Sequence, residues 1–280
     1  MVLPFILRKF LVHQFNALRN LAPNKALGRN KELKDKFKGE TCFILGSGPS
    51  IKTQDLSKLA GQYVITQNNF HVHKDIELLN PIAHCIVPKY QTSEYDNDWL
   101  EWFRDMDEKL PERTLYFMGL NTKYMLDNFP GITEKTYFLE TGFNPLFLKN
   151  ARIDISKRMM NIPTAITQCL SLALYMGFDT IYLSGMDLDQ ICRFKDRDNM
   201  RFYGHSPITR NDQEKSIEDR QFSSGIAYFN RWNTWIQLNL LRKWAEQRNK
   251  KIINITNGGL LDMFEYDDFD SVTARLNNTN

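Results

Sequence analysis

The sequence lacks the features that mark secreted, disulfide-bonded and membrane-spanning proteins. It has four cysteines in 280 residues, with no CxxC pair and no metal-ligand spacing among them. No apolar run approaches the roughly 20 residues that a membrane-spanning helix needs, and no small-residue cleavage site follows the short apolar stretch at the N-terminus. Three of the cysteines lie in apolar surroundings, which predicts buried thiols and fits a reducing compartment, and we expect a cytoplasmic protein.

An excess of charge of one sign is also missing from the chain as a whole. The net charge is +3, which gives no reason to expect a nucleic-acid partner. The excess is local, because residues 1–39 contain nine Lys and Arg against two acidic residues, a net +7, and the remainder has a net charge of −4. We therefore expect a basic N-terminal segment over residues 1–40 and a globular domain over residues 41–270.

The basic segment has the spacing of an amphipathic helix. Over residues 5–21, apolar side chains recur three and four positions apart, with Arg8, Lys9 and Arg19 among the polar positions. Such a helix suits the interface of an anionic membrane, and it would then hold the protein on the inner face of the cytoplasmic membrane. It would equally suit packing on the domain or on a partner subunit.

From residue 41 onward, strand patterns alternate with helix patterns. The candidate strands are Cys42–Leu45, Tyr63–Thr66, Ala83–Val87, Thr114–Met118, Thr180–Ser184 and Lys251–Ile255. Helices are expected over residues 163–176, with one apolar face, and over about 227–247. Strands separated by helices pair in parallel, which predicts an α/β fold with an open, doubly wound, mostly parallel Rossmann-like sheet. Residues 190–225 are polar and without periodicity, as in a functional lid or a disordered segment.

In open α/β sheets the ligand lies beyond the carboxyl ends of the strands, so the residues that follow each strand are the informative ones. The first strand is followed by Gly46, Ser47, Gly48, Pro49 and Ser50. Glycines allow close backbone approach, and a helix N-terminus supplies partial positive charge for a phosphate. The stretch is neither a Walker loop nor a complete dinucleotide fingerprint. It predicts a phosphate or nucleotide site, and the alternative is a plain strand-to-helix turn.

The second strand is followed by adjacent amides and a His-x-His pair. Asn68 and its neighbour Asn69 have paired donors and acceptors that suit a base or a sugar. His71 and His73 lack an evident third ligand for a metal, and we interpret them as ordinary surface residues.

The fifth candidate strand, Thr180–Ser184, and the sixth, Lys251–Ile255, are also followed by polar turns. Ser184 and Gly185 precede Asp187 and Asp189, a carboxylate pair that can hold Mg²⁺ or Mn²⁺ against a diphosphate. Asp187 can instead organise the loop by accepting backbone N–H bonds, and the spacing alone does not decide between these roles. The stretch at residues 256–261 repeats the pattern with an amide and two glycines, and we expect a helix to begin after it.

The lid segment contains Tyr203, Gly204 and His205. A histidine in a loop near a nucleotide site suits general-base catalysis, because its pKa lies close to the operating pH.

Taken in order, GSGPS, QNNF, YLSGMDL, YGHS and ITNGGLL resemble the bacterial sialyltransferases of glycosyltransferase family 42. They also resemble the wider group that includes flagellin-modifying factors and archaeal pterin diphosphokinases. The resemblance spans residues 41–264. It implies that Gly46–Ser50 and Asn68 hold the CMP part of a CMP-sugar donor and that Thr164 contacts the donor. It further implies that Ser184, Gly185 and Asp187 lie near the cytidine, and that His205 is the general base.

The chain departs from the sialyltransferase pattern where that family stabilises the departing phosphate with two tyrosines. Asp189 occupies the first of these positions, and no tyrosine occurs between Tyr182 and Tyr203. Tyr203 and cationic side chains can substitute, because a guanidinium pairs well with phosphate oxygens. The candidate arginines are Arg193, Arg197, Arg201 and Arg210, and Arg158 stands near the position of another family arginine.

Three hypotheses follow. The first is a glycosyltransferase that moves a nonulosonic acid from a CMP-activated donor to a lipooligosaccharide, capsule or similar bacterial glycan acceptor. It works by inverting displacement and needs no metal or other cofactor. The second is a pterin-type diphosphokinase with Mg²⁺ on Asp187 and Asp189. The third is a non-catalytic nucleotide-sugar-binding subunit. A helix that contains Trp232, Trp235 and Trp244 is a candidate contact in a homo-oligomer.

Overall fold

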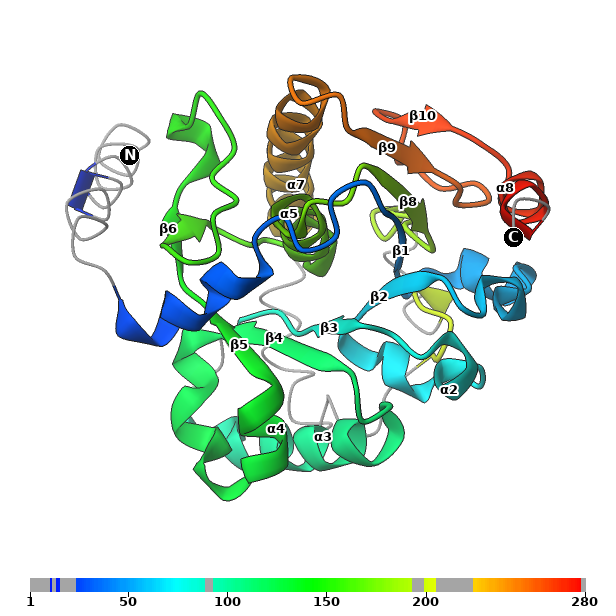
Figure 1. Ribbon diagram of the computed structural model, residues 1–280. Helices are drawn as coiled ribbons and strands as arrows, with labels where there is room; N and C mark the ends of the chain where they lie inside the picture. The colour runs from blue at the N-terminus through cyan, green and yellow to red at the C-terminus, as the bar shows by residue number, and fades with distance from the viewer. Residues whose placement is uncertain are drawn as a thin grey trace.

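The computed structural model describes residues 11, 14–15, 24–88, 93–192, 199–204 and 224–277 (Figure 1). Its strands are β1 Thr41–Leu45, β2 Tyr63–Gln67, β3 Ala83–Cys85, β4 Leu115–Gly119, β5 Thr136–Leu139, β6 Thr141–Phe143, β7 Met159–Met160, β8 Thr180–Ser184, β9 Lys251–Asn254 and β10 Glu265–Tyr266. Its α-helices are α2 Ile76–Leu79, α3 Asp96–Lys109, α4 Pro130–Lys135, α5 Ala165–Met176, α7 Ser224–Glu246 and α8 Phe269–Asn277. Its 3-10 helices are η1 Lys25–Leu33, η2 Pro49–Thr53, η3 Leu56–Leu59, η4 Asn68–Val72, η5 Ser93–Tyr95, η6 Leu120–Asn128 and η7 Pro145–Phe147.

The central sheet is parallel throughout its described strands, in the order β10-β9-β8-β1-β2-β3-β4-β5. The chain runs outward from β1 to β5 on one side and then returns to place β8 against the other side of β1. Phe43 of β1 is thus paired with Val64 of β2 and with Tyr182 of β8. The order of the strands reverses between β1 and β8, which is where ligands bind in doubly wound folds. The predicted Rossmann-like fold is confirmed.

Alternation along β1 divides the core into two layers. Cys42 and Ile44 pack into a cluster that contains side chains of α5 and α7. Phe43 and Leu45 face the opposite cluster, which contains side chains of α3, α4 and α8. Figure 1 shows α5 and α7 on one side of the sheet and α3 and α4 on the other. Helices on both faces explain why the strands read as continuous apolar runs.

Helix α5 corrects one expectation from the sequence. Its pattern predicts a single apolar face, but every residue from Ala165 to Met176 is buried. The helix packs between the sheet and α7, so polar side chains such as Gln168 and Ser171 are bonded inside the protein. The helix ends at Gly177, whose φ of +98° closes the last turn.

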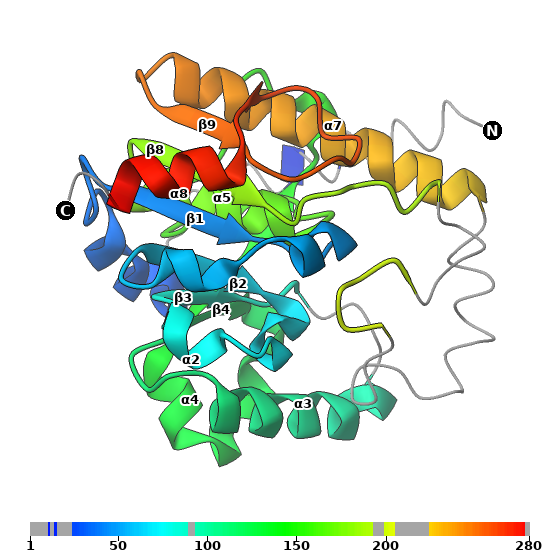
Figure 2. The same cartoon turned by 90° about the vertical axis from the view of Figure 1, so that its right-hand side faces the viewer.

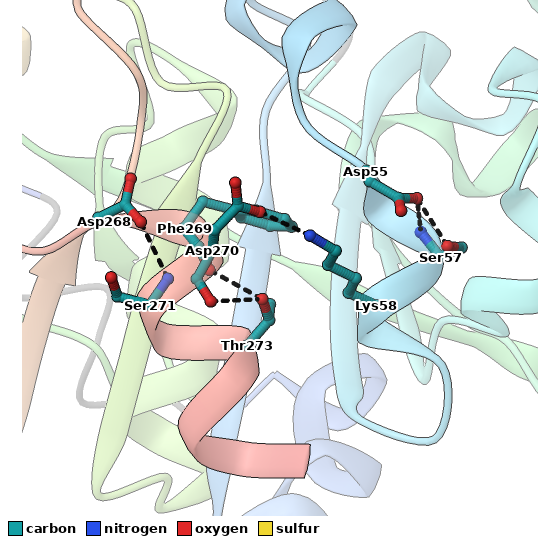
Figure 3. A network of polar contacts seen from close by, with 8 residues as sticks. All are labelled: Asp55, Ser57, Lys58, Asp268, Phe269, Asp270, Ser271 and Thr273. Atoms are coloured by element: carbon teal, nitrogen blue, oxygen red, sulfur yellow. Dashed lines mark hydrogen bonds and ion pairs between the residues drawn. The ribbon is translucent and has the colours of Figure 1, made fainter. Parts of the chain in front are cut away.

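The C-terminal helix α8 is attached to the segment that follows β1 by a polar network (Figure 3). Lys58 Nζ of η3 lies 2.8 Å from Asp270 Oδ1 of α8. Asp55 accepts the Ser57 N–H at the start of η3, and Asp268 accepts the Ser271 N–H at the start of α8. Capping aspartates of this kind satisfy N–H groups that have no partner within the helix.

All four cysteines, and a few residues of the N-terminal segment, lie in the described part of the chain. Cys42, Cys85 and Cys169 are buried and Cys192 is exposed. At the N-terminus the described residues are helical, and the side chains of Leu11 and Phe15 are 58% and 60% exposed. None of the described helices is long and apolar enough to cross a lipid bilayer.

Candidate functional site

The turns that follow β1 and β8 are bonded to each other at the point where the strand order reverses. The Gly46 N–H donates to the Ser184 carbonyl at 2.7 Å, and the Gly48 N–H donates to the Gly185 carbonyl at 2.9 Å. Parallel strands end at the same edge of a sheet, so β1 and β8 deliver these turns side by side. The sequence-predicted residues 46–50 and 184–187 therefore form one structural unit.

The glycines of this unit are required by the contact between the two turns. A Cβ on Gly46 would lie 2.3 Å from the Gly185 carbonyl oxygen, and a Cβ on Gly48 would lie 1.7 Å from Asp187 Oδ2. Gly185 has a φ of +68°, which disfavours any side chain. These glycines let one turn approach another closely, a different role from the close approach to a ligand that the sequence suggests.

Asp187 is the centre of the unit. Its Oδ1 accepts the Ser50 N–H at 3.2 Å, and its Oδ2 accepts the Ser50 hydroxyl at 2.7 Å. The side chain is buried, and burial raises the pKa of the carboxyl, while the bonds from Ser50 favour the ionised form. Of the two roles that the sequence leaves open, the geometry matches the organisation of the loop.

The backbone amides of the glycine-rich turn are almost all used within this unit. Gly46, Gly48 and Ser50 donate to the β8 turn, and Pro49 has no N–H. Among the described residues, the Ser47 N–H is the one amide of residues 46–50 without an acceptor. The helix that follows is η2, a single 3-10 turn that begins at Pro49, so the helix dipole expected there is weak. Within the described structure this turn therefore offers one backbone N–H, that of Ser47, to a phosphate.

The turn that follows β9 closes the unit from the other side. The Leu260 N–H donates to the Asp187 carbonyl at 2.7 Å, and a Cβ on Gly259 would lie 2.5 Å from the same oxygen. The Thr256 hydroxyl accepts the Met186 N–H at 3.0 Å. No helix begins after this turn, contrary to expectation, because β10 follows at Glu265–Tyr266.

Ser184, the last residue of β8, connects the bonded turns to Gln54 through a buried hydrogen bond. Its side chain is fully buried, and its hydroxyl donates to Oε1 of Gln54. Gln54 Nε2 in turn donates to the Ile255 carbonyl at 2.8 Å. Gln54, the residue that follows η2, is thereby bonded both to the end of β8 and to the residue after β9. Sequence reasoning missed this residue, since nothing in a lone glutamine marks it as a link between distant turns.

Asn68 stands at the end of β2, beside β1, in a left-handed backbone conformation with φ of +48°. Its carbonyl oxygen lies 2.8 Å from His84 Nε2 and 3.1 Å from His71 Nδ1. His71 is 1% exposed, so the expectation of a surface histidine is wrong for it. His73 is also largely covered, because its ring stacks on Phe70 with centroids 5.2 Å apart.

The described part of the lid, residues 199–204, reaches the glycine-rich turn (Figure 2). The Phe202 N–H donates to the Ser47 carbonyl at 3.0 Å, and the Phe202 ring packs against Phe70 with centroids 5.3 Å apart. The Tyr203 hydroxyl accepts from Arg201 Nη1 at 2.9 Å. Tyr203 is therefore held close to the turn after β1, and His205 lies two residues further on, outside the described residues.

Thr164 precedes the N-terminus of α5. Helix α5 leads through a short connection into the start of β8, so its N-terminus lies at the carboxyl edge of the sheet. The Thr164 hydroxyl is buried and makes no bond with any described residue, and the first turn contains no acidic side chain. The Ala165 and Ile166 N–H groups have no acceptor among the described residues, as is usual for a first helical turn. These groups suit an anion.

The arginines that could stabilise a phosphate differ in where they lie. Arg158 is buried in an ion pair with Glu140, and Arg193, Arg197 and Arg210 lie outside the described residues. Arg231 of α7, which sequence reasoning missed, donates to Gln190 beside Asp189. Burial lowers the pKa of the Arg231 guanidinium, and the charge of Asp189 opposes this. Asp189, which occupies the position of the first family tyrosine, therefore has a cation beside it.

Metal-ligating side chains do not cluster in the described part of the chain. No three side chains of His, Cys, Asp or Glu in that part of the chain lie close enough together to hold a metal ion.

Comparison with known proteins gives one family match and a set of structural matches. A family profile described as "6-hydroxymethylpterin diphosphokinase MptE-like" matches residues 15–191. No curated protein matches the chain significantly. The sialyltransferase CstII from Campylobacter jejuni, in complex with cytidine-5′-monophosphate, matches with 16% identity and a TM-score of 0.45 over 82% of this chain and 85% of that one. The sialyltransferase CST-II in complex with a trisaccharide acceptor and CMP matches with 18% identity and a TM-score of 0.43 over 81% and 85%.

Proposed function

We propose that the chain, which belongs to the 6-hydroxymethylpterin diphosphokinase MptE-like family, is a CMP-sugar-dependent glycosyltransferase. Its motifs resemble those of the sialyltransferases as well as those of the diphosphokinases. It transfers a nonulosonic acid from the donor to a bacterial surface glycan by inverting displacement. The observation that supports this most is the convergence of five motif segments on one sheet edge. The turns after β1, β8 and β9 are bonded together, Asn68 ends the adjacent strand, and the lid donates to Ser47.

The donor has two parts to be held, a cytidine and a phosphate. Asn68 offers an amide to the nucleoside, because the only bond of its side chain among the described residues is a long one, 3.5 Å from the Val87 N–H. The phosphate is assigned to Thr164 and the first N–H groups of α5, in place of the glycine-rich turn. Free N–H groups and the helix dipole both favour an anion at that position, and the Ser47 N–H adds a further donor.

In the proposed reaction the acceptor hydroxyl attacks the anomeric carbon of the sugar. His205 takes the proton of that hydroxyl as the new C–O bond forms. The bond from the anomeric carbon to the phosphate oxygen breaks, and CMP leaves with the electron pair. Tyr203, polarised by Arg201 at 2.9 Å, lies on the lid where a hydrogen bond to the leaving phosphate can form.

The description of the family favours a second function, the transfer of a pyrophosphoryl group from ATP to a pterin. In that function Asp187 and Asp189 hold Mg²⁺. The bonds from Ser50 to both carboxylate oxygens of Asp187 weigh against it, because a metal would compete with them. The diphosphokinase therefore stands second.

We also propose that the N-terminal segment brings the enzyme to the inner face of the cytoplasmic membrane. The net charge of +7 over residues 1–39 and the exposed side chains of Leu11 and Phe15 support this. Deletion of residues 1–21 is expected to abolish binding to anionic liposomes and to leave the turnover of a soluble acceptor intact. Unchanged liposome binding would remove the proposed membrane role.

The function is tested by hydrolysis of a panel of CMP-sugars and UDP-sugars without acceptor, beside an assay of ATP with a pterin alcohol. Release of CMP from a CMP-nonulosonate, undiminished by EDTA, is the expected result. Pyrophosphoryl transfer that is lost with EDTA and restored by Mg²⁺ would establish the diphosphokinase instead. Nucleotide binding without turnover of any donor would identify a non-catalytic binding subunit.

A further inference from the structure

The buried histidines around Asn68 form a chain of hydrogen bonds that ends on a proposed donor-binding residue. His84 is fully buried in β3, where its neighbours Ala83 and Cys85 are apolar core residues. Burial lowers the pKa of His84 to about 3, so the ring is neutral and carries a single proton. A buried imidazole is costly unless both nitrogens are bonded, and both nitrogens of His84 are bonded.

The position of the proton on His84 follows from its partners. His84 Nε2 lies 2.8 Å from the Asn68 carbonyl oxygen, which can only accept, so Nε2 carries the hydrogen. His84 Nδ1 is then an acceptor, and the Thr66 hydroxyl lies 2.8 Å from it and donates. The series of hydrogen bonds therefore runs from the Thr66 hydroxyl through the His84 ring to the Asn68 carbonyl, and each hydrogen in it has an acceptor.

His71 approaches the same carbonyl oxygen from η4. Its Nδ1 lies 3.1 Å from the Asn68 oxygen, and its Nε2 lies 2.7 Å from Asp105 Oδ2 of α3. Asp105 is in turn 2.5 Å from Lys109 Nζ. The Asn68 carbonyl is thus enclosed by two imidazole rings whose centroids are 6.0 Å apart, and each ring is anchored on a different element.

The enclosed carbonyl explains the backbone of Asn68. A residue with a side chain pays a conformational cost in the left-handed region, and its surroundings must hold it there. The carbonyl is turned inward to the histidines, and the side-chain amide lies at the carboxyl edge of the sheet, where its Oδ1 is 3.5 Å from the N–H of Val87 just after β3. Gln67, the preceding residue, contacts the Met186 sulfur at 3.7 Å, which places this edge against the turn of Asp187.

We propose that His84 is a positioning residue for the nucleotide: its Nε2–H holds the Asn68 carbonyl inward so that the Asn68 amide is presented to the cytidine of the donor, with Thr66 fixing the ring. The identity of the ligand rests on the proposed function. The positioning itself rests on the hydrogen-bond chain, which is present without a ligand.

The test compares a variant of His84 that keeps a hydrogen-bond donor near the Asn68 carbonyl with a variant that removes it. His84→Gln places an amide N–H near the position of Nε2, and His84→Met fills a similar volume without a donor. Calorimetric titration with CMP is expected to show at least about tenfold weaker binding for His84→Met and binding within about threefold of wild type for His84→Gln. Equal affinity of His84→Met and wild type, or an equal loss in both variants, would overturn the proposal.

Two further variants separate positioning from a general loss of stability. Thr114→Val removes a buried hydroxyl that donates to the Pro81 carbonyl at 2.8 Å, at the opposite end of the sheet, and is expected to bind CMP like wild type. Thr66→Val leaves His84 in place but removes the donor to Nδ1, and is expected to weaken CMP binding by a few fold. A loss in Thr114→Val equal to that in His84→Met would show a structural role only.

A readout without nucleotide keeps the two proposals distinguishable. The backbone chemical shifts of Asn68, measured by NMR in each variant, report the left-handed conformation directly. They are expected to move in His84→Met and to stay in place in His84→Gln. If wild type binds no CMP, the proposed function fails, and these shifts still decide the positioning. Unchanged shifts in His84→Met would overturn it.

Discussion

The Asp187 carboxylate accepts both the backbone N–H and the hydroxyl of Ser50, across a separation of 137 residues in the chain. This pair connects the turn after β1 with the turn after β8. The backbone N–H groups of Gly46, Gly48 and Ser50 in the glycine-rich turn are bonded to the turn after β8, and we propose that the groups around this turn face the ligand.

Ser50→Ala is expected to reduce the free energy of unfolding by about 1–3 kcal/mol, because a buried carboxylate loses one of its two donors. Urea unfolding at pH 7 measures the change. Ser57→Ala is the matched control, since its hydroxyl bonds to Asp55 at an exposed position, and we expect it to cost about 0.5 kcal/mol or less. Equal losses in the two variants would show that the Asp187 contact contributes little.

Gly48→Ala is expected to destabilise the protein by about 2 kcal/mol or more, since its Cβ would lie 1.7 Å from Asp187 Oδ2 and force the two turns apart. Gly28→Ala is the control, because nothing lies within 4 Å of its added Cβ and its φ is not positive. That change is expected to be neutral or to stabilise by up to about 1 kcal/mol. A tolerated Gly48→Ala would contradict the close contact of the turns.

His205→Ala is expected to reduce kcat at least ~10²-fold if this residue is the general base. The dissociation constant for CMP should change by less than about twofold, since the base contacts the acceptor hydroxyl and not the nucleotide. Steady-state kinetics with a saturating donor, together with calorimetry, separates the two effects. A normal turnover would remove His205 from the mechanism.

Acid is expected to destabilise the protein partly through His84. Because burial lowers the pKa of His84 from 6.5 to about 3 in the folded state, the folded protein binds this proton more weakly than the unfolded chain does. The stability contributed by the neutral ring is complete above pH ~6.5 and falls by about 1.4 kcal/mol per pH unit as the pH decreases toward 3.

Urea unfolding at several pH values between 7 and 4 checks this contribution in wild type and His84→Gln. His71 and His73, whose pKa values are also lowered by burial, remain in both proteins, so the difference between the two pH profiles reports the loss of His84 together with its effect on the neighbouring His71. The profile of the variant should be shallower. Parallel profiles would contradict a buried neutral ring at this position.

Much of the fold could be predicted because its strands are local patterns. Runs such as residues 42–45 and 180–184 are bounded by turn residues, and their alternation with helices allows only parallel pairing. Strand β5 was missed, although Thr136–Leu139 is apolar, because it follows the short helix α4 without a turn signal between them. Strands β7 and β10 are two residues long, which is too short for any periodicity.

The sequence predicts which turns the fold brings together, and the roles of their residues in a site stay a prediction. The motifs identify which turns meet, because the carboxyl ends of parallel strands share an edge. They do not show that Gly48 faces Asp187 and not a ligand, since that contact depends on how two distant turns pack. The burial of His71 and His84 was unpredictable for the same reason: their partners, Asp105 and Thr66, come from other elements.

We propose that the edge formed by β1, β2 and β8 binds a cytidine nucleotide. Calorimetric titration of the full chain with CMP, and separately with ATP and Mg²⁺, tests it most directly. We predict that CMP binds without added metal and that ATP with Mg²⁺ binds at least about tenfold more weakly. Tight binding of ATP with Mg²⁺ and no detectable heat with CMP would rule out a cytidine site at this edge.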